Sequence, residues 1–135
     1  MAATTTDLQS AVRALDAAFI RHGNAQDAAA LTRAFYAEDA VLLPPGAARV
    51  SGADAIQAFW AAFIAAGAAD ISIETTNIWE AGDLGYGIGT YACTQPAPDG
   101  GRVHDTGKYL VVYRRQADGS WKAVADQFNS DLPSA

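Results

Sequence analysis

Cysteine, methionine, histidine and positive charge are all scarce in this chain. Its 135 residues include one cysteine, one methionine, two histidines and nine lysine or arginine residues. The single Cys93 excludes a disulfide within the chain, and Cys93 with two distant histidines, His22 and His104, cannot form a cysteine-rich zinc site. The carboxylates show no spacing typical of a metal site either. We therefore expect neither a metal nor a cofactor.

The charge balance and the short apolar runs exclude two further classes of partner. The formal net charge is −6, and no basic cluster is larger than Arg114-Arg115, so nucleic acid is not an expected partner. The longest apolar stretch, Phe59 to Ala69, is too short to span a bilayer, and the first residues lack the pattern of a signal peptide. These features predict a cytoplasmic protein without a membrane partner.

Apolar residues make up half of the chain, which is enough for the core of a single domain over residues 1–135. Alanine accounts for 31 residues, most of them before Gly67. Many of the apolar side chains are therefore small, which allows helices to pack closely.

Helical spacing of apolar residues dominates the first half of the sequence. Steps of four, three and four residues predict a helix over Asp7 to Arg21, with Leu8, Val12, Leu15 and Phe19 on one face. A shorter helix is expected from Asp27 to about Tyr36, and a third, with a wide apolar stripe, from Ser51 to Gly67.

The second half changes to the alternation of β-strands. After a short strand over Ala40 to Leu43, alternation from Ile71 onward predicts four further strands, with a bulge near Thr76. The last three strands are expected at Leu84 to Thr94, His104 to Arg115 and Trp121 to Asn129. This order predicts an α+β fold, in which three N-terminal helices cover one face of a strongly curved antiparallel sheet and leave a cavity at the wide end of the resulting cone.

Several motifs resemble the nuclear transport factor 2-like superfamily, and within it the SnoaL-like and ketosteroid-isomerase-like small bacterial proteins. The matching segments cover nearly the whole chain: Phe35 to Leu43, Gly52 to Ile56 with Phe59-Trp60, Gly107 to Tyr113, Asp118 to Lys122, and Asp126 to Ser130. The resemblance implies a cone-shaped, cystatin-like roll and a homodimer formed through the outer face of the sheet.

The resemblance does not transfer the chemistry of ketosteroid isomerases. Those enzymes use a carboxylate base, a tyrosine and a protonated aspartate. The three positions fall here beside Pro44, near Phe19, and at Leu110 or Val111, and none of them carries the required group. Steroid isomerisation by that machinery is not expected.

Lys108 and Asp126 are the polar pair that the sequence offers. A tight hairpin would place them nearly opposite on one face of the sheet, where they would either orient a polar ligand and share a proton or form a salt bridge at the rim. Asn129 similarly fits either a ligand contact or a strand-ending turn.

Glycines alternate at Gly85, Gly87 and Gly89, on the same strand face as Tyr91. A stripe without side chains allows close approach by an aromatic neighbour such as Trp60 or Trp79, by a second subunit or by a ligand. We expect an aromatic side chain of the same chain to lie over these glycines.

We expect a small-molecule-binding domain with an apolar or aromatic pocket and no established catalysis. One alternative is an isomerase, cyclase or dehydratase that uses Lys108 and Asp126, with His104 or Tyr91, for proton transfer on a small hydrophobic substrate. Another is a structural homodimerisation module. The candidate ligand-binding residues are Trp60, Trp79, Tyr91, Lys108, Tyr109, Asp126 and Asn129.

Overall fold

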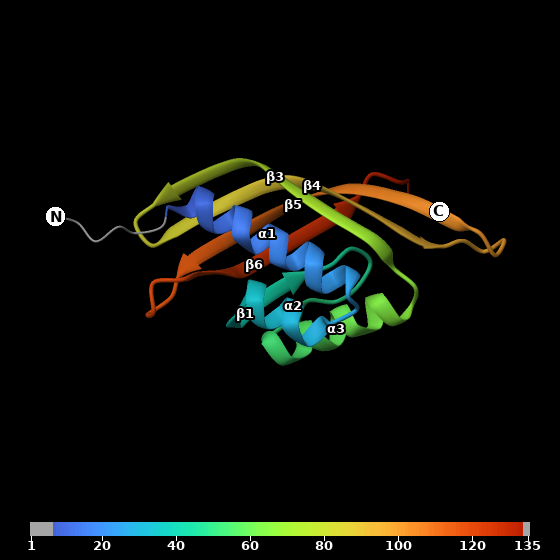
Figure 1. The fold of residues 1–135 in the computed structure, drawn as a ribbon, viewed down its shortest axis with the longest axis horizontal. Helices are drawn as coiled ribbons and strands as arrows, with labels where there is room; N and C mark the ends of the chain where they lie inside the picture. Colours follow the sequence, from blue (N-terminus) through green and yellow to red (C-terminus); the bar gives the residue numbers. More distant parts are fainter. Residues whose placement is uncertain (1–6, 134–135) are drawn as a thin grey trace.

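The chain folds into a layer of helices on one face of a long curved sheet (Figure 1). The computed structural model describes residues 7–133. The helices are α1 (Leu8–Asn24), α2 (Ala28–Phe35) and α3 (Ala53–Ala65). The strands are β1 (Tyr36–Leu43), β2 (Val50–Ser51), β3 (Ala69–Ala81), β4 (Leu84–Pro96), β5 (Arg102–Arg115) and β6 (Trp121–Ser130), in the spatial order β2-β1-β6-β5-β4-β3. The predicted α+β architecture is confirmed.

The two first helices begin at aspartates that cap them. The carboxylates of Asp7 and Asp27 accept hydrogen bonds from the backbone N–H groups of Ser10 and Ala30, at 2.8 and 3.0 Å. These bonds satisfy N–H groups that have no partner within the helix. The predicted apolar face of α1 is buried, and it packs against the inner face of the sheet.

The strand β1 differs from its prediction. It begins directly after α2, at Tyr36 rather than Ala40, and it pairs in parallel with β6. The other strand pairs are antiparallel, as predicted. The parallel pairing places Leu42 beside Asp126 and so joins the helical half of the chain to its last strand.

Register shifts between paired strands help to set which side chains face the helices. The register of β3 with β4 shifts between Thr75 and Asn77, which confirms the predicted bulge near Thr76. The register of β5 with β6 shifts between Val112 and Tyr113. Because an extra residue in a strand reverses the faces of all residues beyond it, these bulges decide which residues reach the interior.

Tyrosines from β4 and β5 lie over glycines of the neighbouring strand on the inner face. Gly89 is paired with Tyr109, and a Cβ atom on Gly89 would come 2.5 Å from Cζ of that tyrosine. Gly107 is paired with Tyr91, and a Cβ there would come 2.5 Å from its Cζ. In the predicted stripe, the rings of Tyr109 and Tyr113 therefore lie over Gly89 and Gly87, in place of Trp60 or Trp79, whereas the side chain of Leu8 lies over Gly85. The expected aromatic packing is confirmed at two of the three glycines.

Candidate functional site

An apolar cavity of about 60 Å³ lies between the inner face of the sheet and the three helices. Its lining is almost entirely apolar and aromatic, and Asp126 is its one charged residue. The lining residues are Phe19, Leu31, Phe35, Trp60, Phe63, Ile64, Ile71, Ile73, Tyr91, Ala92, Cys93, Tyr109, Val111, Asp126 and Phe128. Such a lining is typical of sites that bind small molecules.

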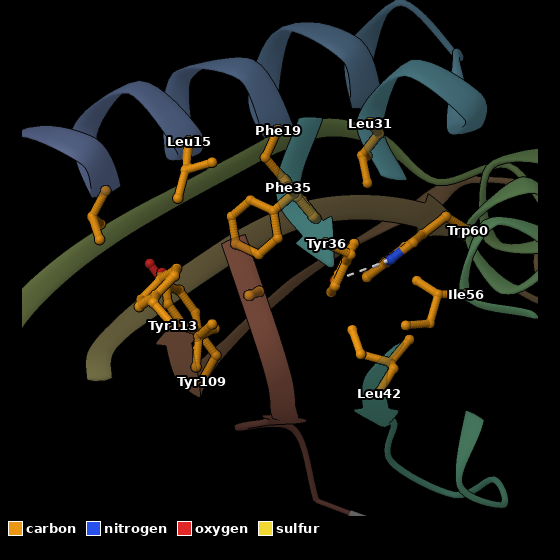
Figure 2. Close-up of a cluster of buried hydrophobic side chains, with 14 of the residues drawn as sticks. Leu15, Phe19, Leu31, Phe35, Tyr36, Leu42, Ile56, Trp60, Tyr109 and Tyr113 are labelled. Atoms are coloured by element: carbon orange, nitrogen blue, oxygen red, sulfur yellow. Dashed lines mark hydrogen bonds between the residues drawn. The ribbon is translucent and has the colours of Figure 1, made fainter. Parts of the chain in front are cut away.

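Trp60 contacts several aromatic rings of the lining and lies beside Tyr36 in Figure 2. Its ring meets Phe19 edge to face at 5.4 Å and stacks on Phe128 at 5.7 Å. Phe128 in turn meets Tyr91 edge to face at 5.8 Å. The half-buried Phe63, Tyr91 and Phe128 form the more accessible part of the lining, whereas Phe19 and Trp60 form its floor.

A buried hydrogen-bonded chain connects Asp126 to this lining. The hydroxyl of Tyr36 donates to Oδ2 of Asp126 at 2.6 Å, and Nε1 of Trp60 donates to the Tyr36 hydroxyl at 3.2 Å, a bond drawn in Figure 2. The three side chains come from β1, β6 and α3 and are each more than nine-tenths buried. Oδ1 of Asp126 forms no hydrogen bond with the described residues, so this oxygen remains available to a group inside the cavity.

Burial changes the acidity of this pair. It raises the pKa of Asp126 to about 6, although the hydrogen bond from Tyr36 opposes part of that rise. Burial, and the nearby Asp126 carboxylate, hold the pKa of Tyr36 well above its usual value. Asp126 can therefore exchange a proton near neutral pH, while Tyr36 remains a donor.

A second buried polar group lies behind Tyr109. The hydroxyls of Tyr109 and Thr75 are 2.7 Å apart, and Oγ1 of Thr75 donates to Oδ2 of Asp16 at 2.7 Å. Burial raises the pKa of Asp16. Among the described residues, neither Oδ1 of Asp16 nor the buried hydroxyl of Tyr113 has a hydrogen-bond partner. Asp16 does not line the apolar cavity.

Four of the seven predicted ligand-binding residues line the cavity: Trp60, Tyr91, Tyr109 and Asp126. Trp79, Lys108 and Asn129 do not. Trp79 is 53% exposed and stacks on Tyr86, because the bulge in β3 turns its side chain to the outer face. Asn129 is the register partner of Lys108.

The predicted pairing of Lys108 with Asp126 is wrong. The hairpin register places Val111 opposite Asp126, and Lys108 is an odd number of residues away from Val111, so its side chain points to the outer face. There it forms an ion pair with Asp131 at 2.8 Å. His104 is also exposed, whereas Cys93 is buried and its thiol has a raised pKa, in keeping with a small core residue.

Tyr36 is the polar site residue that sequence reasoning did not select. It occurs in the segment Phe35 to Leu43, where it was noted only as part of a family motif. Its partner is 90 residues away across a parallel strand pair, and no local pattern reveals such a contact.

A curved sheet closed by three helices around an inner cavity defines the class of this protein as nuclear transport factor 2-like, with a cystatin-like fold. Within that class, the chain belongs to the SnoaL-like domain family, which it matches over residues 17–124.

Solved structures of similar fold come from several bacteria. A ketosteroid isomerase-like protein from Erwinia carotovora atroseptica has a TM-score of 0.80 at 20% identity, over 92% of this chain and 96% of that one. An NTF2-like protein from Novosphingobium aromaticivorans has a TM-score of 0.77 at 22% identity, over 94% and 84%. A hexachlorocyclohexane dehydrochlorinase from Novosphingobium barchaimii has a TM-score of 0.75 at 18% identity, over 93% and 87%. At these identities the likeness establishes the fold, and a comparison with curated proteins gives no match.

None of the helices formed by residues 7–133 combines the length and apolar character needed to cross a bilayer. Within the same range, no three side chains of His, Cys, Asp or Glu lie close enough together to hold a metal ion.

Proposed function

We propose that this protein binds a small apolar or aromatic molecule in the inner cavity, with Asp126 as the polar anchor. The observation that carries the proposal is the composition of the lining, in which one carboxyl oxygen without a partner among the described residues adjoins an otherwise apolar wall. Apolar walls supply affinity through the hydrophobic effect, and a single polar group fixes orientation.

The volume of the cavity limits the size of a ligand that can enter without movement of the lining. About 60 Å³ exceeds the space needed for one water molecule but is below the roughly 150 Å³ of an engineered apolar cavity that binds benzene. A ligand with a ring therefore requires movement of the half-buried Phe63 or Phe128. Phe63 belongs to the last turns of α3 and Phe128 to the end of β6, so both lie near the ends of their elements.

An acid–base enzyme is the second candidate. Asp126 has a pKa of about 6, a fixed hydrogen bond from Tyr36 and a position in the cavity wall, which are properties of a general acid or base. Isomerases, cyclases and dehydratases that act on hydrophobic substrates need such a group. Lys108 and His104 lie on the outer face, so this proposal now depends on Asp126 with Tyr36.

Ligand-induced stabilisation tests the binding proposal. A library of small aromatic and alicyclic compounds would be screened by thermal shift, and a compound at a hundred times its dissociation constant should add roughly 2.7 kcal/mol to the free energy of unfolding. Val111→Phe, which fills the cavity, should abolish the shift. Val112→Phe makes the same change on the opposite face of β5 and should preserve it. Stabilisation by no compound, or an equal shift in both variants, contradicts the proposal.

We also propose that two copies of the chain associate through the outer face of the sheet. Large apolar side chains there are 37–53% exposed, among them Trp79, Tyr86, Ile88 and Leu110. No helix covers this face among the described residues, and the exposed side chains adjoin one another across β3, β4 and β5. Lys108 and Glu74 place charges of both signs beside this patch, which suits a self-complementary two-fold interface.

A further inference from the structure

Asp105 is a second buried carboxyl on the inner face of the sheet, and the cavity lining does not include it. Its side chain is 7% exposed, although the β4–β5 hairpin extends beyond the helices at this end of the molecule (Figure 1). None of the ion pairs formed by residues 7–133 involves Asp105. A buried carboxylate without a cation is unusual, because such groups are normally paired.

The hydrogen bonds to Asp105 leave part of its accepting capacity unused. Oγ of Ser130 donates to Oδ1 at 2.5 Å. Oδ2 receives two longer contacts, from Nε2 of Gln95 at 3.3 Å and from the hydroxyl of Tyr91 at 3.5 Å. A carboxylate can accept about four hydrogen bonds, and contacts of 3.3–3.5 Å are weak. Oδ2 is therefore suited to a stronger donor.

Two residues that pair with or contact Asp105 line the cavity, although Asp105 itself does not. Cys93 lines the cavity and is the register partner of Asp105 on the neighbouring strand. The ring of Tyr91 also lines the cavity, while its hydroxyl points to Asp105. Asp126 lies farther inside, since its partner Val111 is six residues along β5 from Asp105, a strand distance of about 20 Å. The two carboxyls thus lie toward opposite ends of the aromatic lining.

We propose that the ligand is amphipathic: its apolar body occupies the cavity, and a hydroxyl or amine at its outer end donates a hydrogen bond to Asp105. This inference rests on the proposed binding function and specifies the chemical class of the ligand. Anionic compounds of the same shape are excluded, because their charge would meet a buried carboxylate.

Four compounds that share one apolar body test this assignment: butylbenzene, 4-phenylbutan-1-ol, 4-phenylbutylamine and 4-phenylbutanoate. Their dissociation constants would be measured by tryptophan fluorescence and calorimetry. The amine and the alcohol should bind more tightly than the carboxylate, by roughly tenfold or more. Asp105→Asn should weaken amine and alcohol binding roughly tenfold and leave butylbenzene within about twofold.

Two variants keep the Asp105 carboxyl. Asp126→Asn removes the inner anchor and should change the affinity for all four compounds, but the amine and the alcohol should still bind more tightly than the carboxylate, because Asp105 is retained. Ser130→Ala removes a neighbour of Asp105 but keeps its carboxyl, and it should also retain the preference. If Asp105→Asn does not fold, amide shifts in wild-type NMR spectra decide: the amine, but not butylbenzene, should move the signal of Asp105.

Three results would overturn the inference. Binding of all four compounds without a preference shows that no donor group is recognised. A preference that is lost in Asp126→Asn and kept in Asp105→Asn places the donor at the inner carboxyl. In both cases the binding function survives. If none of the four compounds binds while other library compounds still stabilise the wild type, only this inference fails; if no library compound stabilises it either, the proposed function fails as well.

Discussion

Asp126 lies in the wall of an apolar cavity with a single hydrogen-bond donor, Tyr36, on one of its oxygens. Burial of this kind favours the protonated carboxyl, and one donor only partly offsets it. A buried carboxyl with one hydrogen-bond donor can act either as a ligand anchor or as a general acid or base. Its titration is therefore informative for both candidate functions.

Asp126 should make the protein less stable as the pH rises from about 4 to 6. An unfolded aspartate has a pKa of about 3.9, whereas that of folded Asp126 is about 6. Below pH 4 both states hold the proton, and above pH 6 both have lost it. Between these limits only the unfolded state ionises, which lowers the free energy of unfolding by about 3 kcal/mol in total. Denaturant unfolding between pH 3.5 and 7.5 measures this decrease in the free energy of unfolding.

Asp126→Asn should flatten that decline, because its amide does not titrate. Asp16 also has a pKa raised by burial, so Asp16→Asn is the matched comparison and should remove only its own contribution. A decline in Asp126→Asn that runs parallel to that of the wild type would show that Asp126 does not titrate in this range.

Tyr36→Phe should raise the pKa of Asp126 above about 6, because the lost hydrogen bond is the interaction that lowers it. The same change leaves Nε1 of Trp60 without its acceptor, and we expect a cost of about 1–3 kcal/mol. Carbon-detected NMR titration of the Asp126 carboxyl measures the pKa, and chemical denaturation measures the cost. Tyr113→Phe is the control, since that buried hydroxyl has no partner among the described residues and its removal should cost little. An unchanged pKa would contradict the assigned role of Tyr36.

At the scale of elements, the helices and the four long strands could be predicted, because apolar periodicity is a local property. The face that each strand residue presents could not be predicted as well. Trp79 and Lys108 were both expected in the pocket, and both lie on the outer face. The bulge near Thr76 turns Trp79 to the outer face, and the hairpin register does the same to Lys108. The sequence predicts that a bulge exists, but the residue at which it falls and the register of the hairpin decide the faces, and neither can be counted reliably from the sequence.

The parallel contact of β1 with β6 was missed for a related reason. Turn signals reveal strands that are joined by short loops, and the two strands are separated by most of the chain. Tyr36 therefore could not be linked to Asp126, even though each residue lies in a segment that resembles the family. Asp126 itself was selected, but for a partner on the wrong face.

The pairing of tyrosines with glycines between β4 and β5 yields a prediction at this scale. Gly89→Ala should displace the ring of Tyr109, because its Cβ would overlap with that ring and with the neighbouring backbone of Glu74. We expect a loss of about 1–3 kcal/mol in stability and a changed affinity for cavity ligands. Gly101→Ala, in the loop of the same hairpin, meets only the carboxylate of Asp99 and should be mild in both assays. Equal effects of the two changes would argue against the close fit.

At the scale of the whole molecule, the two faces of the sheet differ in what covers them. The helices bury the inner face, and the outer face retains exposed Trp79, Ile88 and Leu110. Sedimentation at micromolar concentration should give twice the 14.1 kDa mass of one chain. Ile88→Lys, at the centre of the patch, should shift the protein to monomers, because it places like charges opposite each other across a two-fold interface. Thr90→Lys, farther along the same strand, should have a smaller effect. A wild-type monomer would refute the proposed association.

The parallel pairing of β1 with β6 also constrains the order in which the protein folds during synthesis. While a ribosome extends the chain at about 5–20 residues per second, the helices and the β3–β5 meander emerge before residues 121–130 exist. Until then β1 lacks the strand that separates it from β5, Tyr36 lacks its acceptor, and the aromatic lining lacks Phe128. The inner cavity is consequently the last part of the domain to be completed during synthesis. A nascent chain stalled before Trp121 should bind chaperones and no cavity ligand, whereas a chain extended by a linker so that Ser130 has left the exit tunnel should bind the ligand and no longer bind chaperones.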